Sequence, residues 1–104
     1  MNQVSFKNFV LDQLREIPDL QCRPMFGGYG LYSDGRFFGI IFEGKVYFNT
    51  DTHTVSAYAN EGMRPFQPGK KPTLKNYYEV PAFVLEDHED LTGWATKAMN
   101  AESH

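Results

Sequence analysis

The side chains best suited to chemistry are few in this 104-residue sequence, and they are scattered along it. The one cysteine is Cys22, and the histidines are His53, His88 and His104. A metal site usually draws on pairs of such residues at short spacings, and the sequence holds no such pair. The neighbouring Arg23 could lower the pKa of the Cys22 thiol, but no histidine close in sequence could serve as its base. We therefore expect no catalytic residue, no metal site and no cofactor.

Four carboxylates surround His88 and could supply a general acid and a general base. They are Glu86, Asp87, Glu89 and Asp90. Such a run is also typical of a helix start, where Asp87 would cap the first turn and the helix dipole favours negative charge. The helix-cap interpretation is the simpler one, so we expect that the protein is not an enzyme.

A glycine-rich stretch over residues 23–32 is the most distinctive part of the sequence. It combines glycines with large apolar side chains and leads into a turn signal, in the order Arg23, Pro24, Met25, Phe26, Gly27, Gly28, Tyr29, Gly30, Leu31 and Tyr32, then Asp34 and Gly35. A phosphate-binding loop places its glycines after a strand and before a helix, whereas these glycines precede a predicted strand. We interpret the stretch as shaped backbone at a strand entry, where glycine permits positive φ or close approach.

A second candidate site is a basic loop at residues 64–75. Cations interleaved with aromatic rings suit single-stranded nucleic acid or an acidic protein surface. The basic residues, with no acid among them, are Arg64, Lys70, Lys71 and Lys75, and the neighbouring rings are Phe66, Tyr77 and Tyr78. Lysines that only keep a loop soluble would give the same pattern, and we favour that interpretation. The net charge of −3 also makes direct binding to DNA unfavourable.

Hydrophobic periodicity predicts the elements that must hold these residues. Apolar residues at spacings of three and four predict an N-terminal helix that Ser5 caps and that ends near Glu16. Alternating residues bounded by turn residues predict antiparallel strands at 29–33, 36–42, 45–49 and 74–80. A short helix within residues 51–60 and a C-terminal helix after Asp87 complete the order α-β-β-β-α-β-α. We expect a single α+β domain over residues 1–104, with helices packed on one antiparallel sheet in two layers.

Turn residues and core residues refine this scheme. Asp34-Gly35 suits a tight hairpin because both residues tolerate positive φ, and Glu43-Gly44 is a weaker signal of the same kind. Gly62 should end the short helix, and Pro81 should end the last strand. The side chains expected in the core are Phe6, Phe9, Leu14, Ile40, Val46, Phe48, Leu91 and Trp94.

The location of the protein is predicted from what the sequence lacks. A lone cysteine cannot form a disulfide within the chain, which fits the reducing cytoplasm. The first residues show no basic segment followed by an apolar run, so no signal peptide is expected. No apolar run approaches the ~20 residues that a membrane span needs. We expect a cytoplasmic protein without a membrane segment.

Several short pieces, in order and at consistent spacing, extend over nearly the whole chain. They are residues 23–32, 34–41 and 45–51, then Gly62 to Phe66 with Pro65, then Tyr77 to Pro81 with Tyr78, and finally Leu85 to Asp87 with Leu91 and Trp94. With these pieces the sequence resembles the TfoX N-terminal domain family as a stand-alone N-terminal domain. The resemblance implies a two-layer α+β fold similar to secretion-chaperone-like domains, which commonly form dimers. It implies no catalytic residue and no cofactor, and a role in natural competence that runs through partner regulators.

The leading hypothesis is a protein-interaction domain that acts as a transcriptional co-regulator or adaptor and docks through a sheet face or edge. A homodimer is a further expectation from the resemblance. The tyrosines that could form a docking surface are Tyr29, Tyr32, Tyr47, Tyr77 and Tyr78. Two alternatives stay open: a nucleic-acid contact module through the basic loop, and a small-ligand-binding domain with its pocket beneath the glycines.

Overall fold

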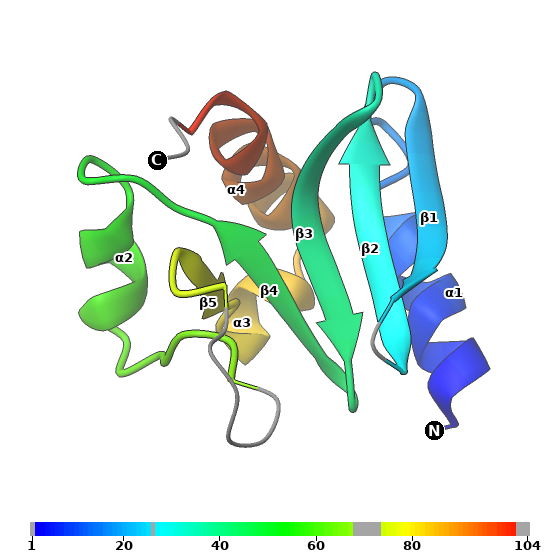
Figure 1. The fold of residues 1–104 in the computed structure, drawn as a ribbon, viewed down its shortest axis with the longest axis horizontal. Coiled ribbons are helices and arrows are strands. Elements are labelled where there is room, and N and C mark those ends of the chain that lie inside the picture. The colour runs from blue at the N-terminus through cyan, green and yellow to red at the C-terminus, as the bar shows by residue number, and fades with distance from the viewer. Residues whose placement is uncertain (1, 26, 68–73, 102–104) are drawn as a thin grey trace.

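One antiparallel sheet organises the chain in the computed structural model, which describes residues 2–25, 27–67 and 74–101. Its strands follow one another in the spatial order β1-β2-β3-β4-β5, as Figure 1 shows. The α+β class predicted from the sequence is therefore confirmed. The elements are α1 (Gln3–Gln13), β1 (Leu20–Met25), β2 (Gly28–Ser33), β3 (Arg36–Phe42), β4 (Lys45–Asn49), α2 (Val55–Ala59), β5 (Tyr77–Glu79), α3 (Ala82–Leu85) and α4 (His88–Asn100).

Helices α1, α3 and α4 lie behind the sheet in Figure 1, while α2 lies beyond the β4 side. The main core fills the space between the sheet and these helices. Its most deeply buried members include Leu31, Phe38 and Phe48 from the sheet and Val10 and Leu91 from α1 and α4. Of the predicted core, Leu14, Ile40, Val46, Phe48 and Leu91 are buried, whereas Phe6, Phe9 and Trp94 are only half-buried.

The glycine-rich stretch departs from its prediction, because its first part is a strand. Residues 20–25 form β1, which pairs with β2 from Leu20↔Ser33 to Met25↔Gly28. This strand was not predicted because it contains Pro24, and proline is unusual within a sheet. The observed order is α-β-β-β-β-α-β-α-α rather than α-β-β-β-α-β-α. Phe26 lies outside the described residues.

Both ends of α1 and the length of the last strand differ from their predictions, and α1 ends at Gln13 rather than near Glu16. Helix α1 begins two residues before Ser5, and Asn2 is its cap, with Oδ1 accepting a 2.7 Å hydrogen bond from the Ser5 N–H. The last strand is shorter than predicted, and Pro81 instead precedes the one-turn helix α3. Asp87 caps α4 as predicted, with Oδ1 accepting a 3.0 Å hydrogen bond from the Asp90 N–H.

The predicted turns have the required backbone. Asp34 and Gly35 have φ of 51° and 79°, and Glu43 and Gly44 have 48° and 75°. Two consecutive residues with positive φ define the tight hairpins that match the twist of antiparallel strands. Gly62 also has a positive φ of 74° after α2, as expected for the residue that ends a helix.

Both edges of the sheet carry features that hinder the addition of a further strand. Proline has no N–H, so Pro24↔Tyr29 is a non-hydrogen-bonded pair, and the Pro24 nitrogen faces outward from edge strand β1. At the other edge, the Phe66 N–H donates to the Tyr77 carbonyl at 2.7 Å, and the Glu79 N–H donates to the Arg64 carbonyl at 3.0 Å. Residues 64–66 therefore cover β5, and the sheet face opposite α1, α3 and α4 is the one that the helices leave uncovered.

Replacing Gly28 by alanine should destabilise the fold strongly. A Cβ at this position would collide with the Ile41 carbonyl of the paired strand β3, so the two strands would have to move apart. We expect a loss of about 3 kcal/mol in the free energy of unfolding, measured by urea denaturation. Gly93→Ala in α4 is the matched control, because nothing lies within 4 Å of its Cβ. Alanine also favours helix by about 1 kcal/mol, so equal losses in both variants would contradict the account.

Replacing Pro24 by valine should promote self-association. The substitution restores an outward N–H and a β-favouring side chain on edge strand β1. We expect a larger apparent mass than the wild type in size-exclusion chromatography with light scattering at equal concentration. An unchanged elution profile across a wide concentration range would show that Pro24 does not protect this edge.

Candidate functional site

The sheet face opposite α1 and α4 carries a second, smaller cluster of aromatic and apolar residues. Ile40, Phe66 and Tyr77 are buried in it, while the rings around them remain half-exposed. We call this surface the aromatic face, and it comprises Met25, Tyr32, Phe37, Ile40, Phe42, Tyr47, Phe66 and Tyr77.

Strand alternation and one bulge assign these rings to the face. In β4, Val46 and Phe48 belong to the main core, and the intervening Tyr47 belongs to the aromatic face. In β3, the register with β2 shifts at Leu31/Tyr32, because Leu31 pairs with Gly39 and Tyr32 pairs with Phe37. Phe38 is the extra residue of this bulge and belongs to the main core, whereas Phe37 belongs to the aromatic face. The bulge therefore distributes a nearly continuous apolar strand between two clusters.

Ring contacts join the aromatic face across the sheet. The Phe37 and Tyr77 rings stack with centroids 5.0 Å apart, and Tyr32 packs on Phe37 at 5.3 Å. Phe66 receives Tyr47 edge-on at 4.9 Å, and the Phe42 ring lies 5.4 Å from it. These contacts hold the rings in place. The rings would therefore lose little conformational entropy when a partner docks on them.

Arg23 and Gly30, two residues of the glycine-rich stretch, shape this face. The Arg23 guanidinium lies 4.9 Å from the centroid of the Tyr32 ring. A Cβ on Gly30 would lie 3.2–3.3 Å from the Met25 sulfur and from the Tyr32 and Phe37 rings. Because Gly30 has no side chain, these three side chains can pack closely over its backbone. Gly27, in the turn before β2, has a positive φ of 79°.

The other predicted tyrosines lie elsewhere. Tyr29 is half-buried at the edge of the main core, with the Lys7 ammonium 5.0 Å from its ring centroid. Tyr78 packs on Tyr58 beside the same core, with ring centroids 6.2 Å apart. Of the five tyrosines considered from the sequence, Tyr32, Tyr47 and the buried Tyr77 therefore lie on the aromatic face.

The basic loop is described only at its ends. Arg64 and Lys75 are exposed, and the Arg64 and Pro65 backbone contacts β5. Lys70 and Lys71 lie outside the described residues. The predicted cluster of four cations thus stays a prediction.

Cys22, Arg23 and His88, which were considered for catalysis, lie among residues of the fold that account for their positions. Burial raises the pKa of the Cys22 thiol, and the charge of Lys7 opposes this only in part, so these surroundings disfavour the thiolate form. Arg23, its neighbour, stacks on Tyr32 instead. His88 joins α4 to the end of α1, with Nδ1 2.7 Å from the Gln13 carbonyl and Nε2 3.4 Å from Glu16 Oε1.

The described ranges contain no cluster of three or more His, Cys, Asp or Glu side chains that could hold a metal ion. Within the same ranges, no helix has the length and apolar character needed to cross a membrane.

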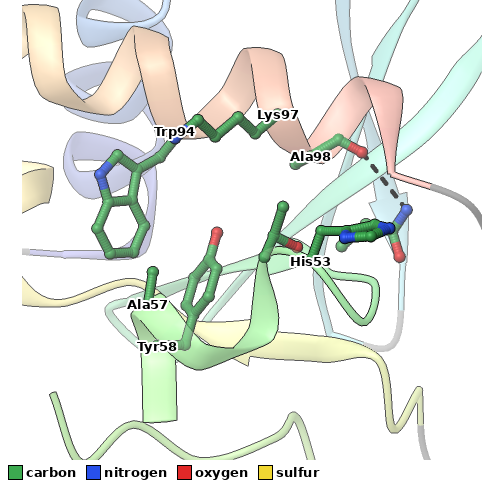
Figure 2. A pocket seen from close by; sticks show the side chains of 8 residues that line it. His53, Ala57, Tyr58, Trp94, Lys97 and Ala98 are labelled. Atoms are coloured by element: carbon green, nitrogen blue, oxygen red, sulfur yellow. Dashed lines mark hydrogen bonds between the residues drawn. The ribbon is translucent and has the colours of Figure 1, made fainter. Parts of the chain in front are cut away.

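A pocket of about 450 Å³ lies between α2 and α4, as Figure 2 shows. Trp94 and Tyr58 form a corner, with ring centroids 4.8 Å apart and an interplanar angle of 74°. Sequence reasoning missed this pocket because it placed Trp94 in the core. The small side chains of Ala57 and Ala98 leave space near this corner. These two alanines were the feature of the sequence that could have indicated the pocket.

Two comparisons relate the chain to known proteins. Residues 12–102 match the TfoX N-terminal domain family. The chain is 26% identical over 96 residues to DNA transformation protein TfoX1 of Aliivibrio fischeri, an alignment that covers 90% of this chain and 44% of that protein. The chain therefore spans less than half the length of this relative. Because the family match extends over most of the residues, the chain belongs to the TfoX N-terminal domain family.

Proposed function

We propose that this chain is a non-enzymatic protein-interaction domain in the regulation of DNA transformation, where it acts as a transcriptional co-regulator or adaptor in the cytoplasm. The family membership and the name of the relative, DNA transformation protein TfoX1, support the process. The aromatic face supports the mode of action, and it is the observation that carries the proposal. Half-exposed rings held by their neighbours are typical of surfaces that bind another protein.

The position of the aromatic face favours face docking over strand addition. Pro24 interrupts the outward hydrogen-bonding groups of β1, and residues 64–66 cover β5. A partner strand added to β1 would find no N–H at Pro24, and one added to β5 would have to displace residues 64–66. A partner that docked on the face would meet Tyr32, Phe37 and Tyr47 without such a change.

The charges around the aromatic face favour a protein over a nucleic acid. Arg23 is engaged with the Tyr32 ring, and Lys45 lies 3.9 Å from the Glu79 carboxylate. Both cations are therefore partly committed within the domain, and the overall charge of −3 would repel phosphates. Contact with nucleic acid through Arg64, Lys75 and the intervening lysines is the alternative.

The double substitution Tyr32→Ala and Tyr47→Ala should abolish partner binding while leaving the fold intact. Both rings are half-exposed, so their loss should disturb the main core little. Aromatic hot spots contribute about 2 kcal/mol or more each, so the loss of one ring alone corresponds to at least ~30-fold weaker binding and the loss of both to a larger factor. The partner would first be captured from nuclease-treated lysate of the native bacterium and then titrated in purified form by calorimetry.

Phe83→Ala is the matched control for this experiment. Phe83 is 55% exposed, but it lies on α3, away from the aromatic face. We expect it to bind like the wild type and to support normal transformation frequency in cells, which the double variant should lower. Equal binding by wild type and double variant, at unchanged melting temperature, would contradict docking on this face.

The nucleic-acid alternative makes a different prediction. Binding through the basic loop should weaken steeply with salt, because each neutralised phosphate releases counterions. Titration of labelled single-stranded DNA with the wild type and with Arg64→Ala/Lys75→Ala at two salt concentrations tests it. We expect no salt-sensitive binding. A steep salt slope that falls in the variant would favour the alternative over the proposed function.

A further inference from the structure

We propose that the pocket between α2 and α4 is a binding site for a small aromatic carboxylate. This inference is independent of the proposed docking on the aromatic face, because it rests on a different surface. The pocket volume of about 450 Å³ lies within the range of small-molecule sites, about 300–1,000 Å³.

The walls of the pocket suit a flat apolar body. The Trp94 and Tyr58 rings meet in a T-shaped arrangement, and Figure 2 shows both facing the space below α4. Ala57 and Ala98 add small apolar surfaces, so a ring could lie against the aromatic corner without a clash. Edge-to-face and offset-stacked contacts would favour an aromatic ligand over a branched aliphatic one of the same size.

The Tyr58 hydroxyl provides a hydrogen-bond donor inside the pocket. The residue is only 3% exposed, and its hydroxyl points toward α4 in Figure 2. Tyr58 contacts the Tyr78 and Trp94 rings, but its hydroxyl makes no hydrogen bond to any residue that the structure describes. Burial raises the pKa of Tyr58 well above its usual value, so the group stays protonated and can donate to an acceptor oxygen.

The charges of the pocket lining favour an anion. Lys97 is the positively charged residue among the described lining residues, and none of them is acidic. Among the described residues, Lys97 forms no salt bridge, and its side chain extends along α4 beside Trp94 in Figure 2. The Ala98 carbonyl at this helix end already accepts a 3.4 Å hydrogen bond from Asn49 Nδ2, which reduces the negative character of the rim. A ligand carboxylate could therefore pair with Lys97 while its ring occupies the aromatic corner.

Trp94 reports on this site directly, since it is the only tryptophan of the chain. Phenylacetate and its neutral analogue phenylacetamide are the probes, and Trp94 fluorescence is the readout. We expect a saturable change with phenylacetate at a Kd of about 1 mM or lower, as ligand efficiency allows for so small a molecule. Phenylacetamide should bind at least about fivefold more weakly, because it cannot form the ion pair.

Two variants locate the binding. Lys97→Gln should remove the preference for the carboxylate, and Tyr58→Phe should weaken both probes by about three- to tenfold through loss of the hydroxyl donor. Phe83→Ala should bind like the wild type, because Phe83 is not part of the pocket lining. Circular dichroism of each variant checks the fold, and the Trp94 indole N–H resonance gives a second readout. No saturable response to phenylacetate, or equal affinities in wild type, Lys97→Gln and Tyr58→Phe, would overturn the proposal.

Discussion

The register shift between β2 and β3 is the constraint on which both faces of the sheet depend. Strand β3, Arg36–Phe42, carries large apolar side chains that are divided between the two faces of the sheet. One extra residue at Phe38 places that ring in the main core and leaves Phe37, Ile40 and Phe42 on the opposite side. A regular strand would change the faces of several of these side chains, because side-chain direction alternates with every residue. The way in which β3 divides its side chains between the helix-packed core and the aromatic face therefore depends on one local irregularity.

Close backbone packing makes this arrangement rigid. Gly28 leaves no space for a side chain against Ile41, and Gly30 lets the Met25, Tyr32 and Phe37 side chains converge. The two glycines allow β2 to pack close to its neighbouring strands. This close packing fixes the backbone beneath the half-exposed rings. A surface built on paired strands keeps its shape before a partner arrives, which lowers the entropy lost on binding. The same rigidity would suit an adaptor, whose task is to present a constant surface.

The sequence predicted those features that local chemistry determines. Two consecutive residues that tolerate positive φ marked both hairpins, and Asp87 marked the start of α4. The strand β1 was missed because Pro24 argues against a strand unless the strand lies at an edge, and edge position is a property of the tertiary structure. The aromatic face was predicted only as a set of tyrosines. Tyr29 and Tyr78 could not be assigned to the helix side of the sheet without knowledge of the strand register. The register between β2 and β3 also places Phe37 beside Tyr32. The pocket was not predicted because it depends on how α2 packs near Trp94, and that packing is a property of the tertiary structure.

Hydroxyl-radical footprinting of the domain, free and bound to its captured partner, tests the central claim most directly. The method reads the solvent exposure of individual aromatic side chains, and the half-exposed Tyr32, Phe37 and Tyr47 are oxidisable in the free domain. Docking on the aromatic face predicts that these rings become protected in the complex while Phe83 on α3 stays as reactive as before. Protection of Phe83 with unchanged reactivity of the three rings would place the partner on the helix side and contradict the account.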